Sequence, residues 1–361
     1  MRSELERYTN LGYFNTARGL GMLLILFGHS LSPFFDAPDQ TQVIFSGAGS
    51  LLGAGIMALF FMISGFGFYS RSAKKCWSTQ TKLLLKPYMI TAAAVLLSKM
   101  LLALLKQRPF SKHGGELVLT YLLGLNAEGG SQLGDIPVDS VSIFWFILAL
   151  FGSWVIYNAI SRLKSQRIRF FLTLFCVILG YILTCVSTIW PYCFPIMLLS
   201  VGYLAAGTVI KQQKLLERKL PLWSWVIMVA VALTCCAFGF VNIVACQWNL
   251  GLLDVAGSFC IGFLLMRLYH HWMQMNHAGF MIQILERIGF HSIWIVFLHG
   301  YEKVIFPWYR LQMLLPNHPL LCVCICLLAR CAVIYGMFRL LYPLSQMIRR
   351  KRRSKFQLST R

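Results

Sequence analysis

The sequence is short of charge. Charged residues make up only 12% of the 361 residues, about half of the ~25% that is typical of soluble globular proteins. Acidic residues are the scarcest, with 12 Asp and Glu in the whole chain. Hydrophobic residues make up 58%, and a compact soluble chain of this length could not bury so much apolar surface. The composition therefore excludes soluble, disordered, disulfide-stapled and coiled-coil classes. It predicts an all-α, polytopic membrane helix bundle.

The sequence also lacks the common motifs of metal and hydrolase sites. No two cysteines have CxxC spacing, no Cys/His cluster has zinc spacing, and there is no GxSxG motif. The 12 Cys are scattered, mostly within apolar stretches, where they serve as small apolar side chains. A bridge between Cys193 and Cys246 on the external face is a minor alternative. We expect no metal, no bound cofactor, no cleavable signal peptide and no appended soluble domain.

What the chain does contain is a series of long apolar stretches. A membrane-spanning helix needs about 20 such residues. Ten candidate spans follow: roughly 12–33, 47–70, 88–105, 141–161, 170–190, 194–210, 221–241, 250–268, 290–310 and 319–343. They predict one transmembrane domain over residues 1–348. Between the third and fourth spans, the segment Glu116–Gly124 is expected to form a short helix outside the spans.

The basic residues have a strong bias between the connections. The formal net charge is +21, which in a soluble chain would suggest nucleic acid. Here, 24 Lys and Arg fall in both tails and in alternate connections, against five in the other connections. Because positive residues collect on the cytoplasmic side, both termini are predicted to be cytoplasmic. The basic tail 349–361 is then interpreted as a contact with anionic lipid headgroups, and no nucleic-acid partner is expected.

The first span carries two polar residues that are costly in a bilayer, Arg18 and His29. They are eleven residues apart, which places them on one helix face and about 16 Å apart along the axis. Gly19, Gly21 and Gly28 flank this stripe and would allow a neighbouring helix to approach closely. Taken singly, Arg18 could snorkel to the interface and His29 could simply hydrogen-bond another helix. Their shared face favours a function.

The second span is followed by two cations, Arg71 and Lys74. On a continuing helix, this i,i+3 spacing would make them face the same way. Fixed cations at the mouth of a cytoplasmic cavity suit a phosphorylated ligand. Ordinary positive-inside charge is the alternative, and position alone favours it.

These motifs together resemble the integral-membrane acyltransferase-3 family, which includes O-acetyltransferases of surface sugars. The resemblance is carried by Arg18-x10-His29, the segment Phe60–Phe66, and Arg71-x-x-Lys74. Phe144-Trp145-Phe146 and Phe297-Leu298-His299 are also similar to the family. Two positions depart from its pattern: Asn15 stands where many relatives have Asp, and Lys74 replaces a second Arg, a point charge in place of a bidentate fork.

The resemblance implies an acyltransferase in the inner membrane, with the lipid bilayer around it. Cytosolic acetyl-CoA, or another acyl-CoA, would be the co-substrate, and Arg18, Arg71 and Lys74 would bind it. The acceptor would be a sugar hydroxyl of a surface polysaccharide, glycolipid or lipid-linked precursor. His29 would take the proton from this hydroxyl, and His299 is the second catalytic candidate. Ser30, Ser64 and Trp145 are candidate donors to the developing oxyanion.

Other functions remain open at this stage. A secondary transporter or flippase for a glycan or lipid would also bury Arg and His within ten helices, although transporters commonly show broken helices and paired repeats. A non-enzymatic subunit of an envelope assembly complex would give no reason for an aligned Arg18 and His29. Four properties stay open: the acceptor sugar, the acyl chain, the side of the membrane on which transfer occurs, and the oligomeric state. The sequence also leaves open whether transfer is direct or passes through an acyl-enzyme.

Overall fold

The computed structural model describes residues 14–31, 52–107, 111–126, 132–133, 136–239, 241–243, 246–275, 279–308, 310–311 and 318–359. Helices dominate this part of the chain. In order they are α2 (Asn15–Leu31), η3 (Leu52–Ile56), α4 (Met57–Phe66), α5 (Ala73–Gln80), η4 (Thr81–Leu85), α6 (Lys86–Leu105), α7 (Ser111–Leu123), η5 (Ser142–Phe144), α8 (Trp145–Ser161), α9 (Gln166–Val186), η6 (Pro191–Cys193), α10 (Phe194–Gln212), α11 (Leu222–Phe238), α12 (Leu252–Met275), α13 (Phe280–Phe290), α14 (Ser292–Ile305) and α16 (Pro319–Ser359).

Strands are confined to two short antiparallel pairs among the described residues. Gln132–Leu133 (β1) pairs with Ile136–Pro137 (β2), and Val241–Asn242 (β3) pairs with Gln247–Trp248 (β4). Both lie in connections between helices. The predicted all-α membrane class is therefore confirmed.

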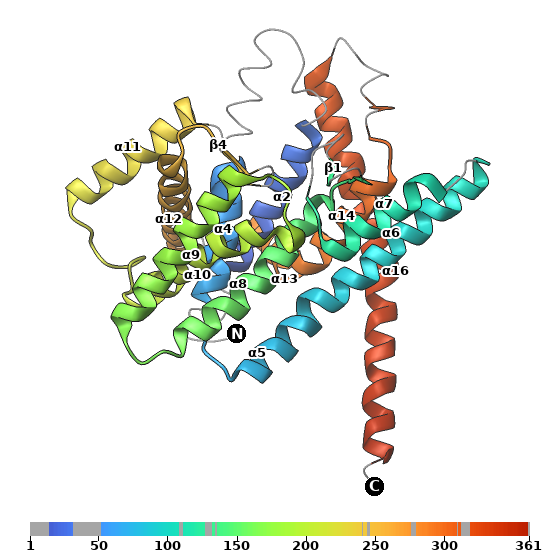
Figure 1. The fold of residues 1–361 in the computed structure, drawn as a ribbon, viewed down its shortest axis with the longest axis horizontal. Helices are drawn as coiled ribbons and strands as arrows, with labels where there is room; N and C mark the ends of the chain where they lie inside the picture. Colours follow the sequence, from blue (N-terminus) through green and yellow to red (C-terminus); the bar gives the residue numbers. More distant parts are fainter. Residues whose placement is uncertain are drawn as a thin grey trace.

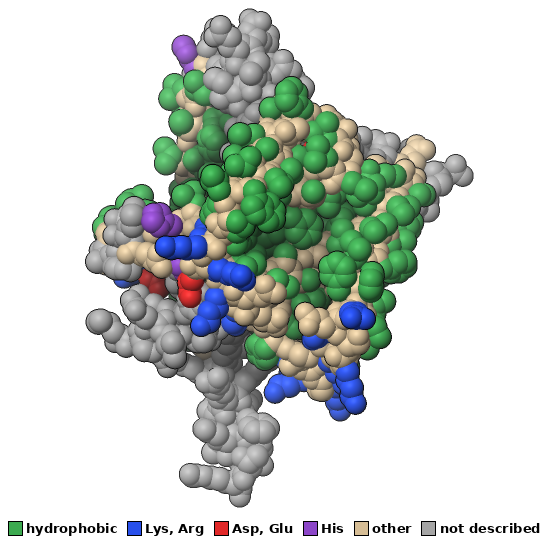
Figure 2. Space-filling view, turned by 90° about the vertical axis from the view of Figure 1, so that its left-hand side faces the viewer, with side chains coloured by type: hydrophobic (Ala, Val, Ile, Leu, Met, Phe, Trp, Pro, Cys, Tyr) green, Lys and Arg blue, Asp and Glu red, His purple; other side chains and the backbone are tan. Residues whose placement is uncertain are grey.

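Six described helices are long and apolar enough to cross a bilayer, or seven if α13 and α14 form one span bent by 72°. Three shorter apolar helices lie at Met57–Phe66, Gly114–Leu123 and Leu222–Phe238. Figure 2 shows a broad band of hydrophobic side chains with Lys and Arg gathered below it, the pattern of a membrane-embedded surface. The count of ten spans and the side of the termini stay predictions.

The elements around α2 form the centre of the molecule. In Figure 1, α2 lies between α4 and α14, with α13 beneath it and the long α16 passing beside it. Gly19 of α2 faces the backbone oxygen of Leu285, and Gly289 of α13 faces that of Asn15. A side chain at either glycine would collide with main-chain atoms that cannot move aside. The close approach expected from Gly19 is therefore present, and its partner is α13.

Three boundaries differ from the expected ones. The predicted span 88–105 is the end of one continuous helix that begins at Ala73. A helix, α13, occupies residues expected to form a polar connection, because its apolar residues Ile282 and Leu285 are buried. The ninth span ends at Ile305, whereas 310 was predicted. The predicted short helix at Glu116–Gly124 is confirmed as α7, and α16 continues as helix into the predicted basic tail.

Candidate active site

Two histidines predicted separately lie side by side within the bundle. His29 is near the C-terminal end of α2, and His299 is in the middle of α14. Their ring centroids are 5.1 Å apart, and the ring planes are inclined by 44°. His299 is fully buried. The fold thus brings together two imidazoles from opposite ends of the chain, at a depth where polar groups are costly.

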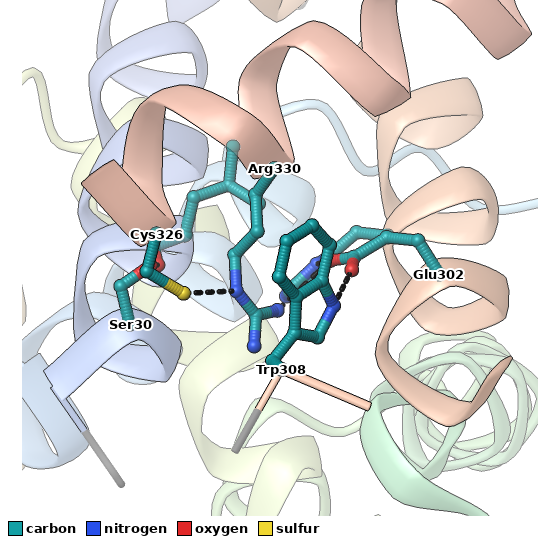
Figure 3. Close-up of polar contacts among 7 residues, drawn as sticks. Ser30, Glu302, Trp308, Cys326 and Arg330 are labelled. Atoms are coloured by element: carbon teal, nitrogen blue, oxygen red, sulfur yellow. Dashed lines mark hydrogen bonds and ion pairs between the residues drawn. The ribbon is translucent and has the colours of Figure 1, made fainter. Parts of the chain in front are cut away.

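The imidazole of His299 is held by a carboxylate, that of Glu302. Nδ1 of His299 lies 2.6 Å from Oε1 of Glu302, one turn further along α14. The same oxygen accepts a hydrogen bond from Nη1 of Arg330 at 2.9 Å. Oε2 accepts one from the indole N–H of Trp308 (Figure 3). Arg330 and Trp308 can only donate, so both oxygens of Glu302 accept hydrogen bonds, as the oxygens of a carboxylate do.

This contact fixes the tautomer of His299. An ionised carboxylate can only accept, so Nδ1 carries the proton and Nε2 keeps a lone pair in the neutral ring. Nε2 is buried and has no hydrogen-bond partner among the described residues. A buried acceptor without a partner costs free energy, so it is a position at which a substrate hydroxyl or a second imidazole could donate. Its surroundings contain one such imidazole, that of His29.

Arg330 ties α16 to this centre. It is 2% exposed, and its guanidinium packs 4.9 Å from the centre of the Trp308 ring. Its Nε donates to the sulfur of Cys326 at 3.5 Å. Figure 3 shows Arg330 and Cys326 reaching from α16 toward Glu302 on α14, with Ser30 of α2 on the other side. With the contact between His29 and His299, the cluster links α14 and α16 to α2, which lies near the other end of the chain.

Sequence reasoning missed Glu302 and Arg330 as members of the site. Neither residue is among the candidates selected from the sequence, although both stand in predicted spans. Two signals were present in the sequence. One was the i,i+3 spacing of His299 and Glu302, which puts both on one helix face. The other was the opposite charge of Arg330 in the middle of a nearby apolar stretch.

The aromatic motif of the fourth span packs next to His299. The rings of Phe144 and Phe297 stack with centroids 6.2 Å apart. A side chain on Gly300, the residue after His299, would collide with the Phe144 ring. Trp145 is 4% exposed. The two aromatic motifs that carried the resemblance thus form one wall of the same centre.

Arg18 lies at the other end of α2 from His29. Its guanidinium donates to the side-chain oxygen of Asn15, one turn earlier. At 1.5 Å per residue, Arg18 and His29 are about 16 Å apart along the axis. The Phe14 and Phe66 rings meet edge to face at 4.9 Å, which places this end of α2 beside the end of α4. Arg18 therefore lies at the level where the chain leaves α4 toward Arg71.

Arg71 and Lys74 do not share one helix face as expected. α4 ends at Phe66 and α5 begins at Ala73, so Arg71 lies in the connection and Lys74 in the first turn of α5. Asn158 of α8 holds the Arg71 backbone in both directions. Its Oδ1 accepts from the Arg71 N–H at 2.9 Å, and its Nδ2 donates to the Arg71 carbonyl at 3.1 Å. This clamp holds Arg71 in the connection between the two helices.

Both cations lie near a cavity. The Arg71 guanidinium covers the Tyr69 ring at 3.9 Å. A cavity of about 490 Å³ lies between α5 and α8, lined by Lys74, Trp77 and Asn158 among others. Lys74 is exposed. The ammonium of Lys74 and the ring of Trp77 therefore line one cavity. Asn158, which holds the Arg71 backbone, lines the same cavity.

Two of the three predicted oxyanion donors, Ser30 and Ser64, have other partners. The Ser30 hydroxyl donates to the Leu26 carbonyl at 2.8 Å, and that of Ser64 accepts from the Trp154 indole at 2.8 Å.

Within the described residues, no group of three His, Cys, Asp or Glu could hold a metal ion. Cys193 and Cys246 are free thiols, both buried.

Comparison with known proteins identifies the family. The sequence profile of the acyltransferase-3 family, described as an acyltransferase domain, matches residues 11–339. The match covers nearly the whole chain and includes every residue of the sites described above. No curated protein and no solved structure matches the chain.

Proposed function

This chain belongs to the acyltransferase-3 family, and we propose that it transfers an acetyl group from cytosolic acetyl-CoA to a sugar hydroxyl of a surface glycan or lipid-linked precursor. Membership makes it a membrane acyltransferase. The donor, the acceptor and an inner-membrane location with ten spans and cytoplasmic termini are parts of the proposal. The single observation that carries it is the buried pair of His29 and His299 with Glu302 behind it.

The chemistry requires a base near the attacking hydroxyl. In the proposal, His29 accepts the hydroxyl proton while the oxygen attacks the thioester carbonyl. The tetrahedral intermediate then collapses, the C–S bond breaks, and CoA leaves as a thiol that takes the proton from the imidazole. His299 lies against His29, and the negative charge of Glu302 lies behind His299. That carboxylate stabilises the positive charge that develops on the imidazole pair. The arrangement follows the logic of a carboxylate that orients and supports a catalytic histidine.

The developing oxyanion also needs support. Arg330 and Lys303 are two cations near the pair, against one carboxylate. Lys303 is one turn from His299 on α14, at i,i+4. In the proposal this positive surplus stabilises the negative charge on the carbonyl oxygen as the tetrahedral intermediate forms. Ser30 is a weaker candidate, because its hydrogen is already donated to Leu26.

The donor binds from the cytoplasmic end in this proposal. Arg71 and Lys74, beside the cavity between α5 and α8, contact the phosphates of CoA. Arg18 lies at the same end of the bundle as α4's terminus. The pantetheine arm then follows α2 from Arg18 toward His29. The ~16 Å between these two residues is a distance that such an extended arm can span.

The test is a transfer assay on membranes that contain the protein. Membranes are given radiolabelled acetyl-CoA and the host's surface glycan, and label in the glycan is measured. We expect label that depends on the protein and disappears in His29→Gln and His299→Gln. Glycan export without label would support the transporter alternative and contradict the proposal.

A further inference from the structure

A second cavity lies far from the proposed catalytic pair, between α11 and α12. It has a volume of about 770 Å³. Its walls are apolar over most of their length, with Val229 and Leu233 from α11 and Ile261 and Leu265 from α12. Its polar lining is at one end, where the chain enters α11 and leaves α12. In Figure 1, the two helices approach at their upper ends and diverge toward the connection 212–221.

The contacts between α11 and α12 explain this shape. At the closed end, the Cys235 thiol donates to the Leu253 carbonyl at 3.3 Å. At the open end, the Arg267 guanidinium lies 5.2 Å from the Trp225 ring and donates to the carbonyls of Leu215 and Arg218. Only Ala232 and Cys235 of α11 are buried. α11 is therefore held at its two ends, with a gap between.

The length of the gap matches one leaflet of a bilayer. Its α11 wall runs from Trp225 to Cys236, which are eleven positions apart, or about 16 Å at the helical rise. Half of a ~30 Å hydrocarbon core is about 15 Å. The outer surface of α11 is apolar and exposed, with Leu222 at 79% and Val226 at 59%. A chain that fills the gap would therefore lie in the hydrocarbon region with its polar end at the interface.

The basic charge near the polar end comes from the adjoining segment, because the lining itself holds one cation and one acidic residue. Arg267 and His271 line the mouth, with Glu217 as the one acidic residue in the lining. The adjoining segment carries Lys211, Lys214, Arg218 and Lys219. Basic pockets between membrane helices on the cytoplasmic side suit anionic lipid headgroups, and Figure 2 shows Lys, Arg and His gathered below the hydrophobic band on this face.

From this geometry we propose that the cavity between α11 and α12 is a binding site for one anionic phospholipid. One acyl chain lies between Val229 and Leu265, and the phosphate lies at the mouth beside Arg267. The site is separate from the proposed reaction and does not depend on it. Glu217 at the mouth repels an anionic headgroup. Neutralising Arg267 should therefore weaken lipid binding, whereas neutralising Glu217 should strengthen it.

The test uses the full-length protein in nanodiscs made from equal parts of phosphatidylglycerol and phosphatidylcholine with identical acyl chains. Native mass spectrometry counts the lipids retained after release. We expect one retained phosphatidylglycerol. Arg267→Gln should lower its retention about fivefold, since a surface cation is worth ~1 kcal/mol to an anionic lipid. Glu217→Gln should raise it.

Val229→Trp fills the gap without touching the charges and should abolish retention. Ile227→Trp is its matched control, since Ile227 is 54% exposed and does not line the cavity. If Arg267→Gln fails to accumulate, the difference in lipid retention between Val229→Trp and Ile227→Trp tests the proposal. Equal retention of phosphatidylcholine, or wild-type retention in Val229→Trp, would overturn the proposal.

Discussion

Nδ1 of His299 lies 2.6 Å from Oε1 of Glu302, and this contact gives the two histidines of the site different surroundings. His299 is bound to a carboxylate that also receives Arg330 and Trp308. His29 faces His299 from another helix. An oriented imidazole beside a second imidazole is a means of moving a proton within a low-dielectric interior.

His29→Gln is expected to abolish transfer. Gln keeps a hydrogen-bonding group but cannot serve as a base, and loss of a general base costs ~10²–10⁴-fold in rate. The measurement is initial rate per unit of protein in membranes, with abundance determined in parallel. A histidine that only packs helices together predicts the reverse, with most activity retained in His29→Gln and lower abundance in His29→Ala.

Glu302→Gln is expected to lower kcat without changing KM for acetyl-CoA. The substitution preserves size but removes the charge that supports the imidazole pair, and losing such a carboxylate in a catalytic triad costs up to ~10⁴-fold. Gln and Ala both leave the buried Arg330 without its charge partner, which costs ~3–5 kcal/mol. Gln is preferred because its side-chain oxygen still accepts a hydrogen bond, and protein abundance is measured in parallel. An unchanged kcat would reduce Glu302 to a structural role.

Arg71→Ala is expected to raise the KM for acetyl-CoA about ten- to hundredfold, since a hydrogen bond to a charged group contributes ~1.5–3 kcal/mol. Lys74→Arg should be tolerated or slightly favourable, because it restores a fork that can grip phosphate. Lys75→Ala is the control, since Lys75 is an exposed neighbour outside the cavity lining. Equal KM values for Arg71→Ala and Lys75→Ala would mean that Arg71 does not bind acetyl-CoA and is ordinary positive charge on the cytoplasmic side.

Gly289→Ala is expected to reduce the amount of folded protein. The added methyl would meet the backbone oxygen of Asn15, and overpacking costs ~1–3 kcal/mol. Gly336→Ala is the matched control, because nothing lies within 4 Å of a side chain at that position. Thermal unfolding in detergent should show a lower Tm for Gly289→Ala alone. Equal Tm values would mean that α2 and α13 can move apart at no cost.

Reporter fusions test the predicted topology. The bias of basic residues puts Arg361 in the cytoplasm and the segment Gly129–Asp139 outside. Fusions at these two positions should report opposite sides of the membrane. A report of the same side at both would refute the arrangement of ten spans.

The helices of this protein were largely predictable, because apolar stretches of spanning length have few other uses. The same argument placed Arg18 and His29 on one face of α2, since helical periodicity is local. The pairing of α2 with α13 was not predictable, since it depends on Gly289 meeting Asn15. The contact that holds Arg71 between α4 and α5 was also missed, because Asn158 is 87 residues away in the sequence.

At the centre of the site, too, local features were predictable and contacts between distant segments were not. His29 and His299 could each be selected as costly polar residues within apolar stretches. Their contact could not be predicted, since it requires α2 and α14 to pack together. Arg330 reaches Glu302 only because α16 packs on α14, and nothing local to either residue encodes that distance.

The most direct test of acyl transfer at the His29–His299 pair is mass spectrometry of surface glycans from cells that carry one of four forms. These are wild type, His29→Gln, His299→Gln and a gene deletion, with equal protein levels in the first three. We expect full-length glycan in all four cells, with the acetyl mass present only in cells that carry the wild-type protein. Acetylated glycan in cells that carry His29→Gln, or loss of the whole polymer in the deletion, would contradict it.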